Sequence, residues 1–281
     1  MERRARGESS DINARYAYRP DKRIDERSRA RKMLAGNDQR PIVVVYAHVW
    51  FDFPHTFAMS HFTDFRDWME LTLTHVCSNK GVMWLIKPHP TEAMYGGFHL
   101  ADLARDLPPH VKLLPLDTDN KTVLTAVDCV VTVHGTVGLE ATVQGLPVIL
   151  ADRSYFSDWG FAHVAEDRAD YLRLLDMAGS LAPPSLAKRD LARASFALAL
   201  AEPPAETGAL RMSCDSLGSA LYSEVIGQAC GGVDTLARER DRLANFLDQN
   251  EIDSFCTFHL LELARRRTGE TAFAENTELI I

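Results

Sequence analysis

The chain has 281 residues, of which 46% are hydrophobic and 25% are charged, so it can bury a sizeable core as one domain with an appendage or as two small domains. Its formal net charge of −8 argues against non-specific nucleic-acid binding, which depends on neutralising phosphates with Lys and Arg. No apolar run approaches the ~20 residues that a membrane helix needs, and no apolar stretch follows the arginines of residues 1–10. We therefore expect a cytoplasmic protein, and peripheral contact with the inner membrane through a partner stays open.

The five cysteines are scattered and form no CxxC pair, so the sequence indicates neither a zinc ribbon nor a redox motif. An odd number of cysteines without a pattern suits reduced thiols in the cytoplasm.

The elements expected along the chain divide it into three parts. Residues 1–40 are rich in Arg and Asp, which favours a disordered or loosely docked N-terminal arm, with a helix over 24–34. Residues 41–180 alternate between apolar strand patterns (41–46, 82–87, 111–115, 128–133, 147–151) and helical patterns (65–77, 100–107, 120–127, 137–144, 170–178), with Gly145 as a helix stop. Residues 181–281 are predicted to form an α-helical extension, with helices over 186–201, 235–249 and 252–267, that packs against the sheet domain or a partner.

Alternating strands and helices with short connections predict an α/β fold with a Rossmann-like parallel sheet. In such a sheet all strands end at the same edge, and ligands bind there. The segments that directly follow the predicted strands are therefore the candidates for a functional site.

The first candidate is the segment Lys87-Pro-His-Pro90. The two prolines fix the backbone on either side of His89, so the direction of the imidazole is preset. His89 can donate a hydrogen bond to a phosphate oxygen, and Lys87 can add positive charge. The alternative is a rigid turn with a solvated histidine.

The second candidate is the segment from His134 to Glu140. The small residue Gly135 lets the backbone approach a ligand closely, and the following helix presents N–H groups and the positive end of its dipole. Thr136 adds a hydroxyl to this anion site, and Glu140 can accept hydrogen bonds from a ribose diol. The alternative is an ordinary strand-to-helix turn with Glu140 as a surface acid. Because both candidates fall at the same sheet edge, together they favour a phosphate-binding site.

Two further loops reach this edge. His48, Asp52 and His55 alternate with aromatic residues after the first strand and can line a sugar or base pocket, but they can equally be structural. Their spacing fits no standard metal site, so we expect no metal. The segment 153–161 contains aromatics that can stack on a base or pack in the interior.

The stretches WLIKPHPTE, DCVVTVHGTVGLEATVQGLPVILAD and YFSDWGF resemble the C-terminal domain of bacterial capsule-polysaccharide glycosyltransferases of the GT-B type. That group includes Kdo transferases of capsule export and is similar to polysialyltransferases and teichoic-acid polymerases. The resemblance covers about residues 41–180. It implies that His89 and Thr136, in the turn with His134 and Gly135, contact the phosphates of a nucleotide-sugar donor, CMP- or UDP-linked, and that Glu140 holds the ribose. No separate cofactor is implied.

A GT-B enzyme has two Rossmann-like halves, and the first usually binds the acceptor and supplies the general base. This sequence contains one such half, so we expect a glycan acceptor to be bound with the help of an acceptor domain or a membrane-associated partner. Asp52 is the local candidate for the base, and His89 is a catalytic candidate through its charge on the leaving phosphate. Two alternatives remain: a non-catalytic nucleotide-sugar-binding or assembly subunit, and an enzyme of another class, such as a glycerophosphotransferase or a sugar-nucleotide epimerase.

Overall fold

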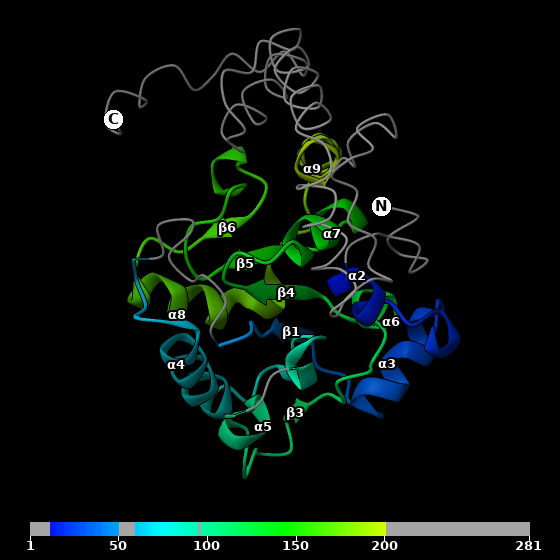
Figure 1. Cartoon of the computed structure of the whole chain (residues 1–281), viewed down its shortest axis with the longest axis vertical. Helices are drawn as coiled ribbons and strands as arrows, with labels where there is room; N and C mark the ends of the chain where they lie inside the picture. The colour runs from blue at the N-terminus through cyan, green and yellow to red at the C-terminus, as the bar shows by residue number, and fades with distance from the viewer. Residues whose placement is uncertain (1–11, 51–59, 95–96, 201–281) are drawn as a thin grey trace, which may run out of the picture. The chain divides into compact units, whose positions relative to one another are not determined.

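The computed structural model describes residues 12–50, 60–94 and 97–200. Six parallel strands form one sheet in the order β3-β2-β1-β4-β5-β6 (Figure 1). The strands are β1 (Ile42–Tyr46), β2 (Met83–Lys87), β3 (Val111–Leu113), β4 (Cys129–Thr132), β5 (Val148–Leu150) and β6 (His163–Val164). This sheet confirms the predicted α/β, Rossmann-like fold and adds β6, whose two residues are too few to give a sequence pattern.

The chain divides into two compact units, Met1–Arg193 and Ala194–Ile281, and the sheet belongs to the first. Helix α9 (Leu186–Leu200) agrees with the helix expected over 186–201. The helices expected over 235–249 and 252–267 lie outside the described residues.

The central strands are buried on both faces, as their continuous apolar runs predict. Every residue of β1, β2, β4 and β5 is buried. In the register of the sheet, Val44 lies beside Leu85 of β2 and Val130 of β4. This burial fixes the strands in place, so the loops that follow them are held at one edge.

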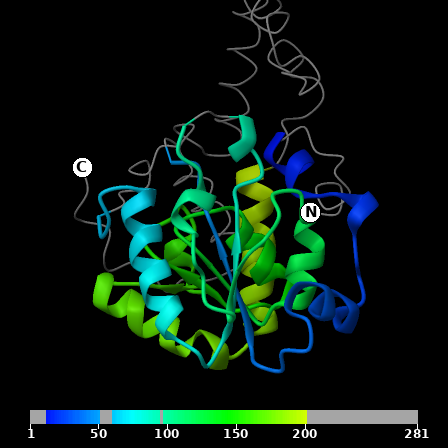
Figure 2. The same cartoon turned by 90° about the horizontal axis from the view of Figure 1, so that it is seen from below.

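Helices cover both faces of the sheet (Figures 1 and 2). Helices α4 (Phe65–Ser78) and α8 (Arg168–Met177) pack on one face, where Trp68 Nε1 donates a 3.0 Å hydrogen bond to the Tyr171 hydroxyl. Helices α3 (Arg27–Ala35), α6 (Asn120–Ala126) and α7 (Val137–Gln144) lie on the other. None of the helices in the described ranges is long and apolar enough to cross a membrane.

Aspartates at the N-caps explain where three of these helices begin. Asp64, Asp119 and Asp167 each accept a hydrogen bond from the backbone amide three residues ahead, in α4, α6 and α8. The helix expected over 100–107 is shorter: α5 ends at Leu103, because Ala104 leaves the helical region and Asp106 adopts a positive φ of 55°.

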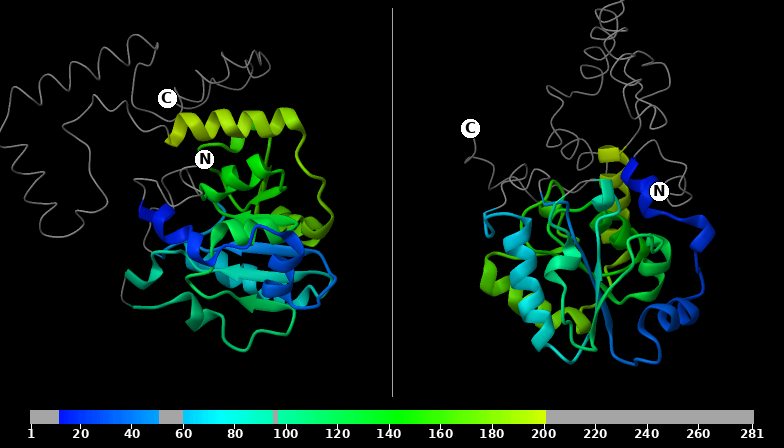
Figure 3. Two further views of the ribbon diagram at one scale, coloured as in Figure 1. Left: turned by 90° about the vertical axis from the view of Figure 1, so that its right-hand side faces the viewer. Right: turned by 60° about the horizontal axis from the view of Figure 1, so that its bottom comes forward.

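The expectation of a disordered or loosely docked N-terminal arm is wrong for residues 12–40. These residues form α2 (Ile12–Ala17), a 3-10 turn (Pro20–Lys22) and α3, which lie along the flank of the sheet (Figure 3). Ala14 and Tyr18 are buried. Hydrogen bonds tie this segment to the region of α6: Arg19 N to Asp119 (2.7 Å), Ile24 N to Thr122 Oγ1 (2.8 Å) and Arg31 Nη1 to Asp128 (2.8 Å). The segment is charged because it docks through ion pairs and backbone donors rather than through a wide apolar face.

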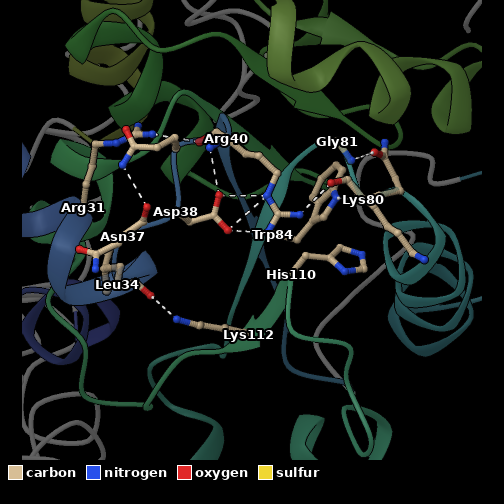
Figure 4. Close-up of polar contacts among 12 residues, drawn as sticks. Arg31, Leu34, Asn37, Asp38, Arg40, Lys80, Gly81, Trp84, His110 and Lys112 are labelled. Atoms are coloured by element: carbon tan, nitrogen blue, oxygen red, sulfur yellow. Dashed lines mark hydrogen bonds and ion pairs between the residues drawn. The ribbon is translucent and has the colours of Figure 1, made fainter.

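Polar side chains at the amino edge of the sheet join its strands to the arm (Figure 4). Arg40, just before β1, pairs with Asp38 and donates to the carbonyl of Lys80, just before β2 (2.7 Å). Lys112 of β3 donates to the carbonyl of Leu34 in α3 (3.4 Å). These groups stabilise the fold. The candidate functional residues follow the strands at the opposite, carboxyl edge of the sheet.

Candidate functional site

The carboxyl edge of the sheet has a topological switch point between β1 and β4. The chain runs from β1 outward to β2 and β3, then crosses to β4 on the other side of β1. In open parallel sheets the crevice at such a point is where ligands bind, because the loops on either side diverge. The segments after β1 and β4 flank this point.

The turn after β4 leaves two neighbouring backbone amides for a ligand. The Gly135 amide donates to Thr132 Oγ1 (3.3 Å), that of Gly138 to the Gly135 carbonyl (2.9 Å), and those of Leu139 and Glu140 to the Thr136 carbonyl. Within the described residues the amides of Thr136 and Val137 have no such acceptor, and the Thr136 side chain makes no capping hydrogen bond. Two amides and a hydroxyl at the positive end of α7 can bind an anion.

Gly135 is required by the close approach of its neighbours. A Cβ placed on this residue would lie 2.9 Å from Thr132 Oγ1 and 3.6 Å from Cε1 of His48. His48 Nε2 lies 3.1 Å from Thr132 Oγ1, so a histidine and a threonine support the turn from below. The Thr132 hydroxyl was not identified from the sequence, since a threonine at the end of an apolar strand reads as a strand residue.

His48 is partly buried and packs against aromatic neighbours. Its ring stacks on Phe65 (centroids 4.4 Å apart, planes at 8°) and meets His134 edge-on at 4.8 Å. Burial lowers the pKa of His48 well below its usual value, and the nearby His134 and His89 lower it further. His48 is therefore neutral at physiological pH, and the structure brings together the histidines that follow β1, β2 and β4.

His89 has a defined tautomer. The Thr91 amide donates to His89 Nδ1 (3.4 Å), and the Thr91 hydroxyl lies 2.9 Å from the same nitrogen. Because Nδ1 accepts, a neutral His89 carries its proton on Nε2 and presents a donor there. Thr91, two residues beyond, is the partner that sets this direction, and the flanking prolines alone did not indicate it.

Glu140 is buried, with 2% of its surface exposed, and it is not a surface acid. The Tyr18 hydroxyl of the N-terminal segment donates to Glu140 Oε2 (2.5 Å). Tyr18 lies 122 positions away in the sequence, so only the docking of α2 brings the two together.

Lys87 lies on the α6 side of the sheet. Its side chain is 1% exposed, and Nζ donates to the carbonyl of Leu116 (3.0 Å). Burial lowers the pKa of Lys87 to about 8, although Asp117 and Asp119 act in the opposite direction. The positive charge of Lys87, which was expected beside His89, therefore lies near Asp117 and Asp119, which follow β3.

Asp152 fixes the far end of the loop that follows β1. This fully buried carboxylate accepts hydrogen bonds from the backbone amides of Ser60 (2.8 Å) and His61 (2.7 Å). Asp152 lies two residues beyond β5 and carries no motif in the sequence, because its partners come from a distant loop. Asp52 and His55, the other polar residues singled out in that loop, lie outside the described residues.

The aromatic segment after β5 packs in the interior. Phe156, Trp159 and Phe161 are buried, and Phe156 stacks on Phe161 at 5.7 Å. A Cβ on Gly138 of α7 would lie 3.0 Å from the Phe156 ring, so this segment supports the helix of the anion site. Across the described ranges, no group of three or more His, Cys, Asp or Glu side chains is arranged to hold a metal ion.

Comparisons with known proteins give one family and two related structures. The profile of the family described as "Capsule polysaccharide biosynthesis protein" matches residues 3–174. One similar structure is KpsC, a beta Kdo 2,4 transferase from Thermosulfurimonas dismutans (21% identity, TM-score 0.35, covering 52% of this chain and 46% of that chain). Another is a putative UDP-N-acetylglucosamine 2-epimerase from Listeria monocytogenes (13% identity, TM-score 0.36, covering 67% and 51%). The chain thus spans about half the length of each, and the comparison with curated proteins gives no match.

Proposed function

This chain belongs to the family of capsule polysaccharide biosynthesis proteins, and from that premise we propose that it binds a nucleotide sugar and acts as a glycosyltransferase in surface-polysaccharide synthesis. The observation that carries the proposal is the turn after β4. Two amides at the N-terminus of α7, which have no acceptor among the described residues, suit the phosphates of a CMP- or UDP-linked donor, and Glu140, one turn further on, suits the ribose.

Each group has a role in the proposed transfer. Negative charge builds on the phosphate as the sugar leaves, and the amides of Thr136 and Val137, the Thr136 hydroxyl and Nε2 of His89 stabilise it. His48 and Thr132 hold the turn in place, so that the donors are preorganised. His134 packs over His48 beside this turn.

The acceptor side of the reaction needs further groups. A base must deprotonate the acceptor hydroxyl, and Asp52, which follows β1 in the sequence, is our candidate. We propose that a second domain or a membrane-associated partner supplies the surface for the glycan acceptor, with the protein acting at the cytoplasmic side of the inner membrane.

Calorimetric titration of the full chain with CMP, CDP, UMP and UDP tests the proposal. One nucleotide should bind the wild type, and His89→Ala and Glu140→Gln should each weaken that binding about tenfold, the loss expected for a hydrogen bond to a charged group. Glu140→Gln keeps an acceptor for Tyr18, so it tests the charge without undocking α2. His75→Ala is the matched control, because His75 pairs with Asp176 on the surface of α4 and α8.

The possible outcomes distinguish a glycosyltransferase from a non-catalytic subunit and from an assembly protein. Binding of one nucleotide that is insensitive to both substitutions would place the site elsewhere. Binding without sugar transfer to an acceptor in the presence of the partner would indicate a non-catalytic subunit. Absence of binding at millimolar nucleotide would refute the nucleotide-sugar proposal and favour an assembly role.

A further inference from the structure

Tyr46 is the last residue of β1 and lies at the switch point, beside β4. The residue is 7% exposed, its hydroxyl oxygen is buried, and that oxygen has no hydrogen-bond partner in the part of the chain that the structure describes. A buried hydroxyl without a partner is unfavourable, and proteins rarely keep one unless something else satisfies it. Phenylalanine would fill the same space at this position without that penalty.

The fold satisfies a comparable tyrosine fully. Tyr171 of α8 is also buried, and its hydroxyl accepts from Trp68 Nε1 (3.0 Å) and lies 2.8 Å from the Thr72 hydroxyl. Tyr171 shows that this fold can satisfy a buried tyrosine hydroxyl, although other buried polar atoms of the described residues, such as Trp50 Nε1 and Ser195 Oγ, also lack a partner.

The surroundings of Tyr46 are polar and belong to the candidate site. In the register of the sheet Tyr46 lies beside Lys87 of β2. Burial raises the pKa of Tyr46 well above its usual value, and the charges of Glu140 and Asp119 raise it further. The hydroxyl thus keeps its proton and can donate a hydrogen bond.

We propose that Tyr46 is a binding residue of the nucleotide site, whose hydroxyl donates a hydrogen bond to the nucleoside that Glu140 holds by its ribose. This inference rests on the proposed function and adds a contact to it. The Tyr18 hydroxyl donates to Glu140 Oε2 in this structure, so the N-terminal segment borders the proposed nucleoside subsite.

The test compares Tyr46→Phe with the wild type in the full chain, by calorimetric titration with CMP and UMP and by chemical unfolding. Tyr46→Phe should weaken the nucleotide that binds about tenfold and should not lower the stability of the protein, because it removes a hydroxyl that the fold leaves unsatisfied. Tyr171→Phe is the matched control: it should lower stability and leave affinity unchanged. Pyrophosphate, which lacks the nucleoside, should bind Tyr46→Phe and the wild type equally.

Each outcome decides between the two proposals. If the wild type binds neither nucleotide, the proposed function fails and this inference falls with it. If the wild type binds and Tyr46→Phe binds equally well, or if Tyr171→Phe loses as much affinity, the inference alone is overturned. Equal loss of pyrophosphate and nucleotide binding in Tyr46→Phe would also overturn it, since the hydroxyl would then act on the phosphate turn.

Discussion

Substitution of Gly135 by alanine tests whether the turn after β4 is as tightly packed as the structure shows. The added Cβ would lie 2.9 Å from Thr132 Oγ1, closer than such contacts occur, so one of the two must move. Thr132 resists, because it is β-branched and its hydroxyl bonds to both His48 and the Gly135 amide. Overpacking of this kind costs about 1–3 kcal/mol, and alanine recovers about 0.4–1 kcal/mol by restricting the unfolded chain. The expected net loss of stability is about 1–2 kcal/mol.

Urea unfolding followed by tryptophan fluorescence measures this loss in the right part of the molecule. All four tryptophans (Trp50, Trp68, Trp84 and Trp159) lie in the unit Met1–Arg193, so the signal reports the sheet unit alone. The control is Gly81→Ala, whose Cβ would meet only Asn79 Oδ1 at an ordinary 3.5 Å, and which should be neutral or slightly stabilising. If Gly135→Ala is as stable as Gly81→Ala, the turn has room for a side chain and the reasoning is refuted.

Two more predictions concern the buried polar groups near this edge. Tyr18→Phe should lower the stability of the sheet unit by about 1.5–3 kcal/mol, because the Glu140 carboxylate loses a hydrogen-bond donor. Tyr16→Phe, at a residue of α2 that is 43% exposed, should leave the stability unchanged. Equal unfolding midpoints of Tyr18→Phe and the wild type would mean that the Tyr18 contact does not hold the segment 12–40. The pKa of Lys87 is about 8 in the fold against 10.5 in the unfolded chain, so between these pH values the unfolded state holds more protons than the folded state. The stability of the wild type relative to Lys87→Met should therefore rise with pH from about 8 to 10.5, by on the order of 3 kcal/mol in all. A difference between the two proteins that stays constant from pH 7.5 to 9.5 would show that the buried ammonium is not perturbed.

The strands and the helix after β4 could be predicted because each carries its own signal. Runs such as Ile42–Tyr46 are apolar along their whole length, which only a strand buried on both faces needs, and Gly145 ends α7 with a positive φ of 90° where the sequence placed a stop. The same local logic placed His89, Gly135, Thr136 and Glu140 at one edge, since parallel strands end together. Their roles toward a ligand remain predictions.

Local signals failed where distant residues decide the outcome. The segment 12–40 reads as a charged arm, and its order comes from acceptors such as Asp119 and Asp128 that lie about a hundred positions away. His48 has the sequence context of a loop histidine, and its stacking on Phe65 appears only in the tertiary structure. Asp152 and Tyr46 carry no motif, and their importance appears only from the amides that Asp152 accepts and from the partner that the Tyr46 hydroxyl lacks.

The amino-acid sequence alone was enough to predict the class of fold and to place the candidate residues at one edge of the sheet. Hydrophobic periodicity and turn-forming residues are properties of short segments, so they can be recognised without knowing the tertiary structure. Which partners these groups have became clear only from the fold: Tyr18 donates to Glu140, His48 contacts Thr132 beside Gly135, and Lys87 donates to the Leu116 carbonyl. Such contacts join residues from separate elements, and they exist only once the sheet has set the positions of those elements.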